Sequence, residues 1–170
     1  VHCALLSAKG VAARARCGFA GYLVDGKWID HWVVELWDGQ RWLLHDSQIG
    51  LVDLSHEQFR SGVEAWELCR AGEADAFDHG IGDLWGWDEL RGSLVNDIGC
   101  LNTVEIGDWD WCAALRVDPL DQPSAPIDDH LDTLAQLAAP DASLGQLRNA
   151  FTNDAVARPP EQVVDAASPR

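Results

Sequence analysis

Alternating hydrophobic and polar residues indicate a small antiparallel sheet near the start of the chain. Residues 11–23 alternate loosely and predict one strand. Asp25-Gly26 then marks a hairpin turn into a second strand, which carries His31. An Asp38-Gly39 pair separates that strand from a third, which ends at Asp46. We therefore expect three antiparallel strands in succession.

Hydrophobic positions at helical spacing predict helices before and after these strands. Residues 1–9 have the pattern of the end of a buried helix, closed by Gly10. Ser55 to Gln58 fits a capping box for a helix that closes at Arg70. Further helices are expected over residues 88–100, 128–139 and 143–151.

The order of helix, small antiparallel sheet and further helices predicts an α+β fold. A chain of 170 residues is long enough to bury a sizeable core. We expect a core over residues 1–54, a helical extension packed on it over 55–158, and a mobile tail over 159–170.

Composition narrows the function classes. The formal net charge is −16, with Lys9 and Lys27 as the only lysines, so we expect neither nucleic acid nor an anionic membrane as a partner. The five cysteines include no Cys-x-x-Cys pair, which favours free thiols in a reducing cytoplasm and predicts no metal site. No sequence motif implies a cofactor. The chain has no methionine, so we expect its natural N-terminus to be missing.

The hairpin brings a histidine and a carboxylate together. An even-length loop centred on Asp38-Gly39 places His31 directly opposite Asp46, with Cβ atoms about 4.5–5.5 Å apart. A carboxylate that orients a histidine is the second half of a nucleophilic triad. The alternative is a purely structural cross-strand hydrogen bond. His45 faces the opposite side of the strand from Asp46 and is expected to be structural.

Several segments match a known pattern in order and spacing: Lys9-Gly10-Val11-Ala12-Ala13-Arg14, Gly18-Phe19, Tyr22, His31-Trp32-Val33-Val34-Glu35-Leu36-Trp37, Arg41-Trp42 and Asp46. On these residues the chain resembles the transglutaminase-like superfamily. The helical remainder, with Trp66, Arg70-Ala71-Gly72 and Leu101-Asn102, looks like bacterial proteins of that superfamily. The resemblance implies a papain-like fold in which a cysteine at a helix N-terminus attacks an amide carbonyl. It implies that His31 is the base and that Asp46 orients it.

The nucleophile is where the chain departs from that pattern. The resemblance places it roughly fourteen residues before Gly10, about four helical turns, and so before Val1. Cys3 precedes Gly10 by seven residues and would lie about 10 Å from the required place. We therefore interpret Cys3 as a packed thiol and keep it only as a weaker alternative nucleophile.

Three functions are open at this point. The first is a transglutaminase-like cysteine enzyme that transfers an acyl group or hydrolyses a protein or peptide amide, with Trp32 as a candidate substrate contact. The second is a non-catalytic scaffold of the same fold, with a partner or a second copy covering the exposed sheet. The third is a carbohydrate-binding module, suggested by nine tryptophans. Four of these lie in or beside the hairpin, where cross-strand aromatic packing is expected.

Overall fold

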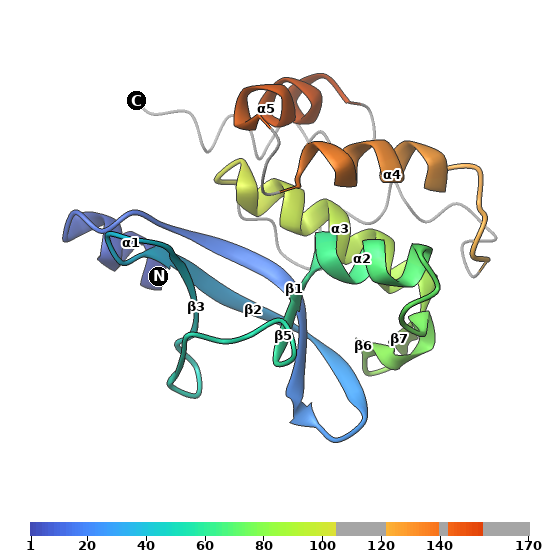
Figure 1. The fold of residues 1–170 in the computed structure, drawn as a ribbon, viewed down its shortest axis with the longest axis horizontal. Coiled ribbons are helices and arrows are strands. Elements are labelled where there is room, and N and C mark those ends of the chain that lie inside the picture. Colours follow the sequence, from blue (N-terminus) through green and yellow to red (C-terminus); the bar gives the residue numbers. More distant parts are fainter. Residues whose placement is uncertain (105–121, 140–142, 155–170) are drawn as a thin grey trace.

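The protein has an α+β fold, seen in a computed structural model that describes residues 1–104, 122–139 and 143–154 (Figure 1). Helix α1 (His2–Ala8) is followed by the strands β1 (Ala13–Val24), β2 (Lys27–Trp37) and β3 (Trp42–Asp46). This order confirms the predicted helix and three antiparallel strands. The expectation that α1 is buried is wrong, because none of its residues is buried.

The described strands form one seven-stranded sheet with β1 and β2 at its centre. The strands β4 (Leu51–Val52), β3, β2, β1 and β5 (Phe59–Ser61) follow one another in antiparallel order. β6 (His79–Ile81) pairs in parallel with the start of β2, and β7 (Leu84–Trp85) pairs with β6. These four short strands were not predicted, because two or three residues are too few to show alternation.

In the part of the chain that the structure describes, four α-helices follow the central strands: α2 (Gly62–Arg70), α3 (Trp87–Leu101), α4 (Asp128–Leu137) and α5 (Leu144–Asn153). They confirm the four predicted later helices, although α2 begins elsewhere than expected. Ser55 and Gln58 do contact each other, but they close a turn before β5. The side chain of Ser61 caps α2 instead, accepting a hydrogen bond from the Glu64 amide. The predicted mobile tail over 159–170 lies outside the described residues.

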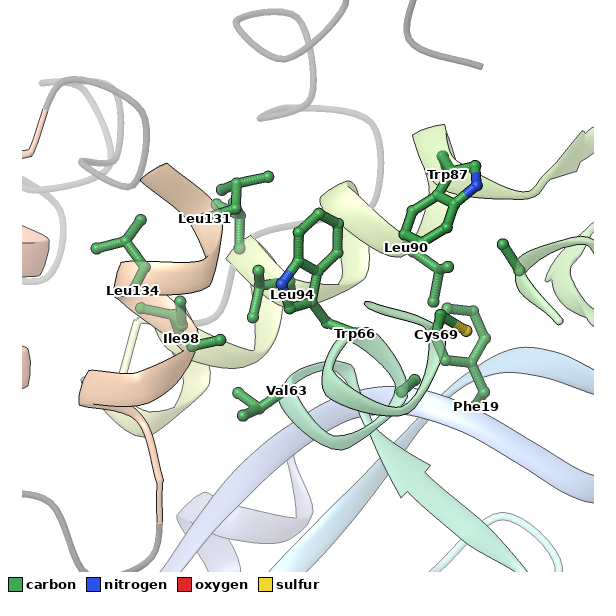
Figure 2. Packing of buried hydrophobic residues seen from close by; sticks show 14 of the residues in the cluster. Phe19, Val63, Trp66, Cys69, Trp87, Leu90, Leu94, Ile98, Leu131 and Leu134 are labelled. Carbon is green, nitrogen blue, oxygen red and sulfur yellow. The ribbon is translucent and has the colours of Figure 1, made fainter. Parts of the chain in front are cut away.

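The main hydrophobic core lies where β1 meets these helices, which gather on one side of the sheet (Figures 1 and 2). Phe19 contributes from β1, and Trp66 contributes from α2 at 1% exposure. α3 supplies four residues with no exposed surface: Leu90, Leu94, Val95 and Ile98. Burial of these side chains explains why α3 is the central helix of the layer.

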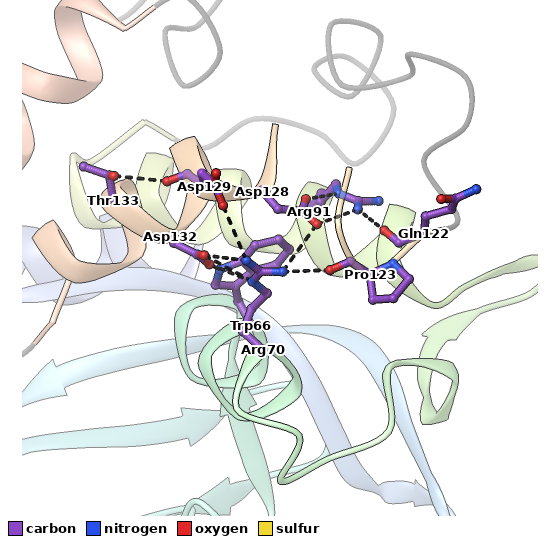
Figure 3. Close-up of polar contacts among 9 residues, drawn as sticks. All are labelled: Trp66, Arg70, Arg91, Gln122, Pro123, Asp128, Asp129, Asp132 and Thr133. Atoms are coloured by element: carbon purple, nitrogen blue, oxygen red, sulfur yellow. Dashed lines mark hydrogen bonds and ion pairs between the residues drawn. The ribbon is translucent and has the colours of Figure 1, made fainter. Parts of the chain in front are cut away.

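A set of ion pairs fixes α4 on α2 and α3 (Figure 3). The side chains of Arg91 on α3 and Asp128 on α4 are both fully buried, and their Nε and Oδ1 atoms are 2.7 Å apart. Arg70, at the end of α2, donates hydrogen bonds to Asp132 and lies over the Trp66 ring. These pairs are specific contacts that set where α4 docks.

A smaller hydrophobic cluster occupies the other face of the sheet. Its buried members come from β1, β2, β5 and the segment before β5: Ala20, Val33, Leu54 and Phe59. Phe19 and Ala20 are neighbours in β1 and join different clusters, as expected from the alternation of side chains along a strand. Within the described ranges, no helix combines the length and apolar character needed to cross a bilayer.

Candidate functional site

The structure brings His31 and Asp46 into direct contact, as predicted. His31 lies in β2 and Asp46 is the last residue of β3. The His31 Nε2 atom is 2.7 Å from Asp46 Oδ2. The two side chains are 11% and 1% exposed, so bulk water screens their interaction little.

The register that produces this contact differs from the predicted one. Trp37 pairs with Trp42, so the loop has four residues, and the pairing is shifted by two positions. The Asp38 side chain closes this longer loop by accepting hydrogen bonds from the amides of Gln40 and Arg41. His31 is therefore diagonal to Asp46 and not directly opposite it.

The contact survives this shift for a simple reason. Side chains alternate along a strand with a period of two, so a slip of two residues keeps them on the same face. Diagonal neighbours on one face are about 7–8 Å apart at their Cα atoms, which two polar side chains can bridge. His45 packs on the other face, where its ring meets His2 at 5.2 Å.

Asp46 is held by more groups than His31. Its Oδ1 accepts hydrogen bonds from the backbone amides of Gln48 and Ile49, at 2.8 and 3.3 Å. Its Oδ2 also accepts one from the Tyr22 hydroxyl, at 2.7 Å. Burial alone would raise the pKa of Asp46, but the hydrogen bonds from Tyr22, His31 and Gln48 outweigh burial and lower it. Asp46 is therefore a carboxylate that stays ionised.

This arrangement gives His31 a defined chemical capacity. Asp46 is ionised, so the hydrogen between it and His31 belongs to Nε2 of the ring. The lone pair of the neutral ring then lies on Nδ1, which is the nitrogen able to take a proton from a thiol or water. The pair can act as an oriented base.

The backbone beside His31 is closely packed. Gly18 is the in-register partner of His31 on β1. A Cβ at Gly18 would lie 2.1 Å from the carbonyl oxygen of Arg60 and 2.9 Å from the Phe59 ring. Only glycine fits at this position. Because Gly18 has no side chain, β5 and the Phe59 ring can pack closely against β1 beside His31.

The other predicted site residues are placed differently. Trp32 follows His31 in β2, so its side chain points to the opposite face of the sheet. The structure does not bring Trp32 together with the His31–Asp46 pair. α1 contacts the sheet through His2 and His45, on the face away from Asp46. That contact provides no link between Cys3 and His31.

One cysteine–histidine contact in the structure was not predicted from the sequence. Cys69 Sγ lies 3.9 Å from His79 Nδ1. Burial raises the pKa of Cys69 to about 11 and lowers the pKa of His79. His79 Nδ1 also donates to the Asp75 carbonyl, so it carries its hydrogen and cannot deprotonate the thiol. This contact is structural. Cys17 is also fully buried, and burial raises its pKa as well.

The tryptophans that the structure describes have mixed environments. Trp66 and Trp87 are buried in the main core and meet edge to face. Trp37 and Trp42 form a cross-strand pair, also edge to face, with each residue 40% exposed. This confirms aromatic packing in the hairpin. In the described part of the chain, no group of three or more His, Cys, Asp or Glu side chains is arranged to hold a metal ion.

Comparison with known proteins found no matching family model, no matching curated protein and no matching solved structure.

Proposed function

We propose that this chain is a transglutaminase-like cysteine domain that transfers acyl groups or hydrolyses protein or peptide amides. The observation that carries the proposal is the buried His31–Asp46 hydrogen bond, which leaves His31 Nδ1 as a base. The resemblance over residues 9–46 supports the same assignment, because it matches both residues in order and spacing. That resemblance assigns the attacking thiolate to a position before Val1.

The proposed reaction begins when His31 Nδ1 takes the proton of the cysteine thiol. The thiolate attacks the carbonyl carbon of the amide, and the resulting imidazolium is stabilised by Asp46. The C–N bond then breaks, the leaving amine takes the proton from His31, and a thioester remains. Water or a second amine attacks the thioester after giving a proton to His31, and the thiolate is released.

Alkylation of the natural full-length protein with iodoacetamide tests this proposal. We expect one cysteine to react much faster than the others at neutral pH. The substitutions H31A and D46N should each lower the alkylation rate of that cysteine at least tenfold. H45A is the matched control, because His45 neighbours Asp46 in sequence but faces the other side of the sheet, and it should leave the rate unchanged.

Uniformly slow alkylation of all cysteines would contradict the proposal. An alkylation rate of the fast cysteine that is equal in H31A and in the protein without substitutions would also contradict it. Either result would favour the non-catalytic, partner-binding domain as the second candidate.

A further inference from the structure

The carboxylate of Asp46 has a complete set of hydrogen-bond donors. The amides of Gln48 and Ile49 occupy Oδ1, while the Tyr22 hydroxyl and His31 Nε2 both reach Oδ2 at 2.7 Å. A carboxylate offers about four lone-pair positions, so all of them are used. The turn after β3 thus fixes one oxygen, and two aromatic side chains from other strands share the second.

Tyr22 reaches Asp46 from β1, where it lies within the irregular stretch between Ala20 and Val24. Its half-buried ring packs against the smaller hydrophobic cluster and lies edge to face with His31, with ring centroids 6.3 Å apart. The tyrosine therefore contacts both members of the pair, one through its hydroxyl and the other through its ring.

We propose that Tyr22 is a positioning residue of this site, whose hydroxyl shares Asp46 Oδ2 with His31 and thereby sets the strength of the His31–Asp46 hydrogen bond. This inference rests on the proposed function. Two donors on one oxygen compete for the same electron density, so each bond is weaker than it would be alone. Tyr22 keeps Asp46 in place and limits how strongly Asp46 attracts the Nε2 hydrogen.

The composition of the chain allows a graded test. Tyr22 is the only tyrosine in the sequence, so labelling with 3-fluorotyrosine changes this site alone. The fluorinated phenol is a stronger donor, and Y22F removes the hydroxyl altogether. The readout is the proton NMR signal of His31 Nε2–H, which moves downfield as its hydrogen bond strengthens. His45, on the opposite face, is the internal control.

We expect the His31 Nε2–H signal to move downfield in Y22F and upfield in the fluorotyrosine protein, with the His45 signals unmoved. D46N should abolish the hydrogen-bonded signal in each background. A His31 signal that does not move along this series, but is lost in D46N, would overturn the role of Tyr22 and leave the His31–Asp46 pairing intact. A signal that persists in D46N would overturn the pairing itself. The isosteric fluorotyrosine protein keeps the test decisive if Y22F does not fold.

Discussion

At the scale of single residues, Asp46 is a buried carboxylate that accepts four hydrogen bonds. A buried carboxylate without donors would pay a large desolvation cost and become protonated. Asp46 avoids this through hydrogen bonds from Tyr22, His31 and two backbone amides. Its pKa is lowered despite its burial, so the charge that orients His31 persists at neutral pH.

The ultraviolet absorbance of Tyr22 can be used to detect the charge of Asp46, because ionisation of the phenol depends on that charge. Burial and the hydrogen bond to Asp46 raise the pKa of Tyr22 above its ordinary value of about 10. Because the folded pKa is the higher one, Tyr22 stabilises the fold below about pH 10, and this stability is lost as the pH rises towards the folded pKa. We predict that tyrosinate absorbance appears in the unmodified protein only together with loss of the circular dichroism signal.

The variant D46N should separate these two events. Without the carboxylate, the pKa of Tyr22 falls, and the phenol should ionise while the circular dichroism signal is still native. The nine tryptophans do not ionise, so the absorbance change belongs to the single tyrosine. Ionisation near pH 10 in the folded, unmodified protein would contradict a phenol bound to Asp46.

At the scale of elements, α2 shows how tertiary context selects a helix start. Ser55 and Ser61 both stand ahead of the same hydrophobic pattern, and the spacing from Ser55 to Gln58 favours the first. Pairing of Phe59 to Ser61 with β1 removes these residues from the helix, so Ser61 becomes the cap. A long-range strand contact therefore overrides the local signal.

We predict that S61A lowers the free energy of unfolding by about 1 kcal/mol, because the Glu64 amide loses its acceptor. S55A is the matched control and should have a much smaller effect, since Ser55 closes only an exposed turn. Urea denaturation followed by circular dichroism measures both variants. A larger loss in S55A would show that α2 begins at the position predicted from sequence.

The attachment of α4 gives a second prediction with a neighbouring control. Asp128 and Arg91 are fully buried against each other, whereas the Asp129 side chain is fully exposed and 3.9 Å from Arg70. D128N leaves a buried guanidinium without its counter-charge and should lower the free energy of unfolding by about 3 kcal/mol. D129N should leave the urea midpoint unchanged. Equal effects of the two substitutions would contradict the docking of α4 through Arg91.

The central hairpin shows how far sequence reasoning reaches at this scale. Alternation predicted which face His31 and Asp46 share, and that part depends only on odd or even spacing. The loop length was not predictable, because Asp38 closes a four-residue loop that the Asp-Gly signal does not distinguish from a shorter one. The contact was predicted correctly while the register was wrong.

At the scale of the whole molecule, the candidate site and most of the core lie on opposite faces of the sheet. α2 and α3 pack against Phe19 on one face, while His31 shares the other with Val33 and the smaller cluster. Substitutions in the helical layer should therefore lower the stability of the fold more than they disturb the geometry of the His31–Asp46 pair. The sequence did not indicate this division, because β5 to β7 join the sheet through contacts distant in the chain.

The net charge of −16 should govern how the whole molecule responds to salt. Self-repulsion destabilises a compact chain, and the Debye length falls from about 30 Å at 0.01 M to about 8 Å at 0.15 M salt. The buried Arg91–Asp128 pair is screened much less than the surface repulsion. We therefore predict that the urea midpoint rises over this range, equally in sodium chloride and potassium chloride. A falling midpoint would mean that exposed pairs such as Arg41–Asp53 contribute more than the repulsion costs.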